Sequence, residues 1–127
     1  WLMRRFTLPQ ILMASLALGV LRFLLIGWQV DSLALLLLAQ VLHAATFGSF
    51  HATAMQMVHR FFTGRHQHRG QAIYGSARFG IGGALGSYYS GLTWESLGPA
   101  ATFAIAAGAA AMAFVVAYFL LQPRPQR

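Results

Sequence analysis

The chain has no cysteine and no lysine, and only two of its 127 residues are acidic, Asp31 and Glu95. Without cysteine there is neither a disulfide framework nor thiolate chemistry. Charged residues make up 9% of the chain, whereas a soluble domain carries about 25%. So few charges cannot cover a water-facing surface, and the net charge of +7 therefore does not indicate nucleic-acid binding, which needs a basic stripe on a soluble fold.

What the chain does contain is long apolar stretches, at about residues 10–29, 33–58, 71–93 and 100–121, in a chain that is 57% hydrophobic. A bilayer core of about 30 Å is crossed by about 20 helical residues. Backbone polar groups in lipid must be paired within the segment, and the alternating polarity of membrane strands does not occur here. The sequence therefore predicts an all-α integral membrane protein, with residues 1–127 forming a single membrane domain of four transmembrane helices.

The charged residues outside these stretches divide by sign. The two ends and the middle connection hold only basic residues, and the other two connections hold Asp31 and Glu95. This distribution matches the positive-inside rule and predicts a multi-pass protein of the cell inner (plasma) membrane, with both ends cytoplasmic. Anionic lipid headgroups would meet the basic side chains. Those side chains are Arg4, Arg5, Arg60, Arg65, Arg69, Arg124 and Arg127.

Two further arginines, Arg22 and Arg78, fall inside the apolar stretches. Arg22 precedes Trp28 by six residues, so it lies about 9 Å below the outer interface. An ionisable residue at membrane depth indicates a functional site by default, although a long side chain can also reach the headgroups. Because neither arginine has an acidic neighbour in the spans, each must extend to an interface, pair with residues outside this sequence, or bind an anionic ligand. For Arg78 we expect either an ion pair or extension to the inner face.

The second stretch carries a polar and aromatic stripe. Gln40, His43, Phe47 and His51 fall within about 80° of one another on a helix, and Thr46 flanks them. Such a stripe would face a cavity rather than lipid. Each histidine is either neutral and hydrogen-bonded to a neighbouring helix or active in solute binding or proton transfer. The candidate substrate and proton pathway is Arg22, Gln40, His43, Thr46, Phe47, Phe50 and His51.

Other chemistry is weakly represented. His59, His66 and His68 lie in the middle connection, but no cysteine or nearby carboxylate completes a metal site. No nucleophile–base pair and no paired carboxylates occur, so we expect no enzyme activity, no cofactor and no metal. The small residues of the third stretch, such as the Gly82–Gly86 pair, predict close packing against a neighbouring helix.

Three segments carry a family resemblance: LHAATFGSFH at 42–51, RGQAIY at 69–74 and WESLG at 94–98. They resemble the last spans of a major facilitator superfamily permease, in the phenylpropionate-permease-like branch that is similar to lactose permease. The resemblance implies helices nine to twelve of a twelve-helix transporter, with the missing N-terminal helices as partners. It also implies solute:proton symport by alternating access.

The resemblance extends to individual residues. Lactose permease has an Arg in its ninth span and a His in its tenth, near the substrate and proton sites, and Arg22 and His43 match these. The proton-carrying Glu of that family is replaced by Thr46, which puts coupling through this carboxylate in doubt, and His51 resembles a His of the phenylpropionate branch. We therefore expect a transporter fragment for a small organic solute, with Arg22 favouring an anion such as an aromatic acid. A complete small four-helix exporter acting as a dimer and a non-transporting membrane subunit are the alternatives.

Overall fold

The computed structural model describes residues 5–29 and 31–121 and contains only helices and short connections in this part of the chain, which confirms the all-α prediction. Arg4, Arg124 and Arg127, on which part of the charge argument depends, lie outside the described residues. The helical elements are α2 (Leu8–Trp28), α3 (Leu33–Phe61), the 3-10 turn η1 (Gly64–His66), α4 (Gln67–Gly75), the π-helix η2 (Ser76–Gly82) and α5 (Gly83–Leu121).

Side-chain caps begin the first two helices. Thr7 caps α2 in a capping box, in which its hydroxyl accepts from the Gln10 amide at 3.4 Å and the Gln10 side chain accepts from the Thr7 amide at 3.0 Å. The Ser32 hydroxyl accepts from the Leu35 amide at 3.5 Å at the start of α3. These bonds satisfy N–H groups that a helix start leaves without intrahelical partners, so they fix where α2 and α3 begin.

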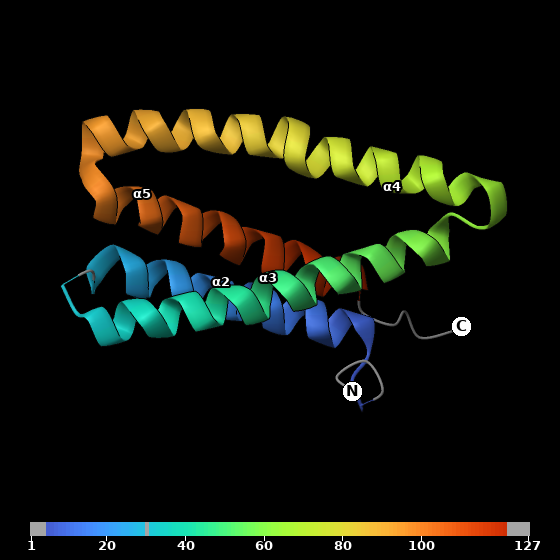
Figure 1. Cartoon of the computed structure of the whole chain (residues 1–127), viewed down its shortest axis with the longest axis horizontal. Helices are drawn as coiled ribbons and strands as arrows, with labels where there is room; N and C mark the ends of the chain where they lie inside the picture. The colour runs from blue at the N-terminus through green and yellow to red at the C-terminus, as the bar shows by residue number, and fades with distance from the viewer. Residues whose placement is uncertain (1–4, 30, 122–127) are drawn as a thin grey trace.

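The number of long apolar helices differs from the prediction, because the described residues form three and not four. The third segment extends from Gly64 to Leu121, but its backbone is non-helical at Gly98, which has φ of 81°, and the chain direction reverses there within α5 (Figure 1). Glycine adopts positive φ without steric cost, and Pro99 directly after it suits the first turn of the next arm. The reversal therefore lies in the connection expected between the stretches 71–93 and 100–121, and the arms of α5 are residues 83–97 and 99–121.

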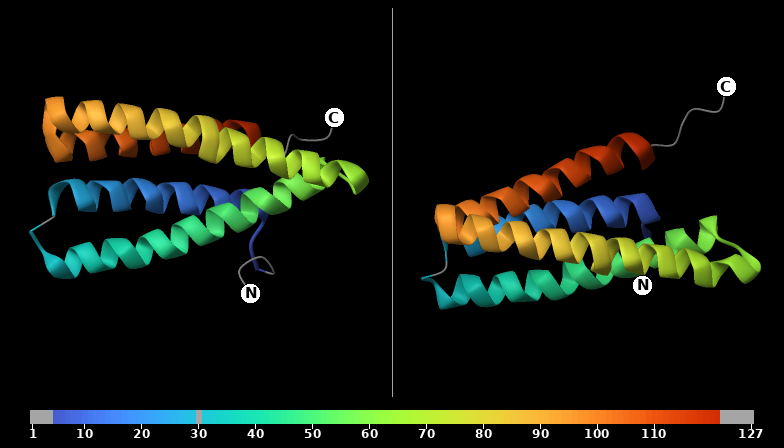
Figure 2. Two further views of the ribbon diagram at one scale, coloured as in Figure 1. Left: turned by 45° about the horizontal axis from the view of Figure 1, so that its top comes forward. Right: turned by 90° about the horizontal axis from the view of Figure 1, so that it is seen from above.

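The helix α2 is the centre of the packing, since its backbone lies close to both α3 and α5, whereas the backbones of α3 and α5 do not come close to each other in the described part of the chain. The views in Figure 2 show α3 crossing beneath the segment formed by α4 and η2 near the loop that joins them. The helices α2 and α5 approach each other closely at Gly27, where an added Cβ would lie 3.0 Å from the Phe103 Cβ.

The predicted close packing of the glycine-rich third stretch is wrong. A Cβ added at Gly86, Gly91 or Gly108 would meet nothing within 4 Å, and one at Gly82 would meet only the Ala77 carbonyl of the same segment. The helices lie too far apart there for small residues to be needed. The close approach that small residues permit in membranes occurs instead at Gly27.

The surface is largely apolar, with exposed side chains such as Leu33, Val41 and Phe119, and the buried residues are mostly small. All three long helical segments have the length and composition to cross a membrane. The α2–α3 turn and the reversal at Gly98 lie at one end of the molecule, and η1 lies at the other (Figure 1). The two acidic side chains are therefore near one end, and the arginines that follow α3 are near the other.

Candidate functional site

A cavity of about 280 Å³ lies where α2, α3, η2 and α5 approach one another. It contains two cationic side chains, Arg22 and Arg78, together with His43. We call it the arginine cavity, and its lining is Ser15, Leu16, Gly19, Arg22, Phe23, His43, Thr46, Phe47, Phe50, Arg78 and Ala110. Segments far apart in the sequence thus bring two positive charges to one space.

The first charge is held by a hydrogen bond between helices. Arg22 Nη1 of α2 lies 2.8 Å from His43 Nδ1 of α3. A guanidinium has only donors, so Nδ1 must accept, and the His43 ring is neutral with its proton on Nε2. The guanidinium also lies 4.3 Å from the centroid of the Phe23 ring, and Arg22 Nε is buried without a hydrogen-bond partner among the described residues. Arg22 therefore retains donor capacity that this part of the chain leaves unused.

The second charge is held in the same way. Arg78 Nη1 lies 2.6 Å from His51 Nδ1 and donates to the Tyr74 hydroxyl at 3.0 Å. By the same reasoning His51 accepts and is neutral in this arrangement. Aromatic rings surround the guanidinium carbon, with centroids 4.7 Å away at Phe47, 4.9 Å at Phe79 and 5.5 Å at Phe50, within the range of cation–π attraction.

Phe47 connects the two arginine–histidine pairs. Along α3 its ring centroid lies 5.5 Å from that of His43 and 6.4 Å from that of His51, and its plane is nearly parallel to the His51 ring. The result is a ladder His43–Phe47–His51 on one face of α3, with Arg22 at one end and Arg78 at the other. The arginine–histidine pairs could not be predicted from the sequence, because they join helices whose relative rotation the sequence does not determine.

The backbone around Arg78 is not the regular helix expected over residues 71–93. Residues Ser76–Gly82 form the π-helix η2, whose wider turn changes the direction in which Arg78 points. Such segments are rare and often occur at functional sites. Tyr74 precedes Arg78 by four residues, and residues at this spacing share a face of a helix. The contact between them could therefore have been predicted from the sequence. The roles of Tyr74, Phe23 and Phe79 in holding the arginines were missed.

The structure brings together most of the predicted pathway residues but not all. Arg22, His43, Thr46, Phe47 and Phe50 line the cavity. His51 lies outside the lining and reaches it through Arg78, whereas Gln40 is exposed and does not line the cavity.

Thr46 takes the position at which the resemblance places a carboxylate. Its hydroxyl donates to the Leu42 carbonyl at 2.7 Å and also lies 3.3 Å from the His43 carbonyl, both in its own helix. A hydroxyl bonded in this way carries no charge with which to neutralise Arg22.

Charge in the arginine cavity is consequently unbalanced. The hydrogen-bond acceptors facing both guanidinium groups are neutral, and the acidic side chains of the chain, Asp31 and Glu95, are in or next to the turns at the far end of the helices. Two cations in an apolar setting are costly unless an opposite charge joins them. The arrangement can therefore bind an anion.

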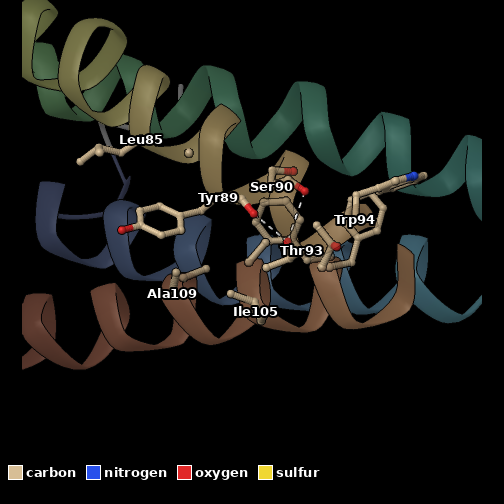
Figure 3. A pocket seen from close by; sticks show the side chains of 13 residues that line it. Leu85, Tyr89, Ser90, Thr93, Trp94, Ile105 and Ala109 are labelled. Carbon is tan, nitrogen blue, oxygen red and sulfur yellow. Dashed lines mark hydrogen bonds between the residues drawn. The ribbon is translucent and has the colours of Figure 1, made fainter. Parts of the chain in front are cut away.

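A second, larger hollow of about 710 Å³ lies between the two arms of α5 and Phe23 of α2. We call it the α5 groove. Figure 3 shows Tyr89, Ser90, Thr93 and Trp94 of the first arm facing Ile105 and Ala109 of the second. Its lining contains no charged side chain, so it offers no specific recognition of an ion.

The comparisons with known proteins identify the family. The model of the MFS_1 like family matches residues 1–105, which include both arginine–histidine pairs. No curated protein and no solved structure matches the chain. With a family match over most of its length and three apolar helical segments able to cross a membrane, the chain belongs to the MFS_1 like family of the major facilitator superfamily, a family of transporters and not of enzymes.

Proposed function

We propose that the chain forms part of a secondary transporter that carries a small organic anion into the cell with protons, by alternating access. The observation that carries the proposal is that Arg22 and Arg78 line one cavity and face only neutral acceptors. The charge distribution supports placement in the inner membrane with the arginine-rich end cytoplasmic.

Arg22 is the principal anion-binding group in this proposal. A carboxylate can accept two parallel hydrogen bonds from one guanidinium, and such charge-assisted bonds are stronger than neutral ones. Arg22 Nε is buried and unpartnered in the described part of the chain, so a carboxylate would supply an acceptor that the protein does not. An unsatisfied buried donor costs about 1–3 kcal/mol, which the bound anion would recover.

The rings around the cavity indicate the rest of the solute. Phe23, Phe47 and Phe50 provide apolar faces next to the guanidinium groups. A volume of about 280 Å³ is at the small end of ligand sites, which usually measure about 300–1,000 Å³. A small aromatic carboxylate fits both the chemistry and the size.

His43 is the proposed proton carrier, in place of the carboxylate that Thr46 replaces. A proton on His43 Nδ1 would convert it from acceptor to donor and break its bond to Arg22. The cavity would then hold a free guanidinium and an imidazolium, and an entering anion would neutralise part of this charge. Proton and anion would therefore bind together, as symport requires.

Further transmembrane helices of the same permease would complete the site. The cavity is lined from both α3 and α5, whose backbones do not come close to each other in the described residues, and it is open between them. In the proposed transporter the helices that cover this opening belong to the other parts of the permease.

The test is uptake of radiolabelled benzoate by liposomes containing the full-length gene product, under an inwardly directed proton gradient. Loss of a charge-assisted hydrogen bond costs about 1.5–3 kcal/mol, so Arg22→Gln should reduce apparent affinity at least roughly tenfold. Arg65→Gln, in the exposed η1 turn, is the control and should leave uptake unchanged. Equal uptake by Arg22→Gln and the unaltered protein would sink the proposal.

A further inference from the structure

We propose that Arg78 is a second anion-binding group of the same cavity, that His51 keeps it from the anion, and that a proton on His51 releases it. The inference rests on the proposed function, because it assigns a second group to the same anion. Its starting point is that Arg78 lines the arginine cavity while its hydrogen bonds point away from it, to His51 and Tyr74, neither of which is in the lining.

The contact between Arg78 and His51 exists only in one protonation state of the histidine. Arg78 can only donate, so His51 Nδ1 accepts at 2.6 Å and the ring must be neutral. A proton added at Nδ1 places N–H against N–H and a second positive charge beside the guanidinium. The bond is then replaced by repulsion, and Tyr74 alone remains as a weaker, neutral acceptor.

The surroundings of Arg78 direct where the released side chain goes. Phe47 and Phe50 lie within 4.7 and 5.5 Å of the guanidinium carbon, and both also line the cavity. Their ring faces continue to attract the cation while it moves from His51 toward the space beside Arg22. The movement is therefore a change of partner within one aromatic cluster and needs no rearrangement of helices.

The charged and titratable groups near His51 make the release depend on an anion. Arg78 faces it from η2 and Tyr74 faces it from α4, with a ring centroid 6.0 Å away. The cation of α2, Arg22, is bound to His43 two turns earlier on α3, and the acidic side chains are in or beside the distant turns. Within the described residues a proton on His51 thus gains no carboxylate, and the anion in the cavity supplies the opposite charge. By linkage, each then promotes binding of the other.

Two substitutions of His51 separate this inference from a merely structural role, because they act in opposite directions. His51→Asn keeps an acceptor for Arg78 but cannot take up a proton, so Arg78 stays held. His51→Ala removes the acceptor, so Arg78 is free at every pH. His59→Asn is the matched control, since His59 is an exposed histidine of the same helix that contacts Gln71.

The experiment is calorimetric titration of benzoate into the full-length gene product in detergent, at about pH 8 and about pH 5.5, on either side of the usual titration of histidine. At the higher pH, His51→Ala should bind benzoate about tenfold more tightly than the unaltered protein. His51→Asn should bind it with the same affinity as the unaltered protein. At the lower pH, His51→Asn should bind about tenfold more weakly than the unaltered protein, and Arg78→Gln should resemble His51→Asn.

Each outcome decides between the two proposals. If His51→Ala binds no more tightly at the higher pH and His51→Asn binds no more weakly at the lower pH, while Arg22→Gln still weakens binding at least roughly tenfold, the role of His51 is refuted and the anion site stands. If the unaltered protein binds no benzoate at either pH, the proposed function fails and the inference fails with it. A change in His59→Asn equal to that in His51→Asn would also overturn the assignment to His51.

Discussion

The arginine cavity and the α5 groove differ in a way that volume does not reveal. The groove measures about 710 Å³ against about 280 Å³, yet it holds no charged side chain, and both of its threonines are hydrogen-bonded to backbone carbonyls of their own helical segment. Thr93 donates to the Tyr89 carbonyl at 2.9 Å, and Thr102 donates to the Gly98 carbonyl at 2.9 Å. The smaller cavity instead holds guanidinium donors with capacity to spare. Recognition of a polar solute depends on hydrogen-bond donors that have no partner within the protein. The larger groove is suited to apolar packing.

The largest effect within this comparison should come from supplying the charge that the arginine cavity lacks. Thr46→Glu would place a carboxylate in the lining of the cavity that also holds Arg22, where it would compete with the solute for the guanidinium. We expect benzoate binding to weaken about tenfold, the usual order for a charge-assisted bond. Calorimetric titration with Thr46→Gln as the uncharged control of equal size would measure it. Equal losses in both variants would show that bulk and not charge is responsible.

A smaller effect should follow from removing the ring that joins the two pairs. Phe47→Leu keeps an apolar side chain but removes the cation–π attraction to Arg78, the stacking on His51 and the tilted ring contact with His43. Cation–π contacts are worth about 0.5–1 kcal/mol at exposed sites, so benzoate affinity should fall about two- to fivefold. Phe61→Leu, at an exposed ring outside the cavity, is the control. If both variants bind like the unaltered protein, the ladder has no part in binding.

The smallest effect should come from the groove itself. Trp94→Ala removes one of the largest rings of its lining but touches no group that holds either arginine. We expect benzoate affinity to change by less than about twofold, within the range typical of substitutions away from a site. Binding at matched protein concentration checks this. A loss as large as that of Arg22→Gln would reverse the assignment of the two regions.

Much of the fold could be predicted from local signals. The apolar stretches and the limits on backbone in lipid predict helices, and α2 and α3 lie over the first two predicted segments. The side chains that share a face of α3 follow from helical periodicity, which is why His43, Phe47 and His51 could be grouped before their surroundings were known.

What could not be predicted depends on contacts between segments or on rare backbone states. The reversal at Gly98 lies in the connection that was expected between the third and fourth stretches, but its form, a single glycine with positive φ before Pro99, was not predicted. The π-helix that carries Arg78 has no recognised sequence signature. Neither arginine could be assigned its histidine, since pairing across helices depends on how each helix is rotated.

The most direct test of the anion site is a crystal or cryo-electron microscopy structure of the full-length gene product with 4-bromobenzoate, in which bromine marks the ligand. We expect the carboxylate within hydrogen-bonding distance of Arg22, with the ring against Phe23, Phe47 or Phe50. A ligand bound in the α5 groove beside Tyr89 and Trp94, with Arg22 still bonded only to His43, would contradict the proposed site.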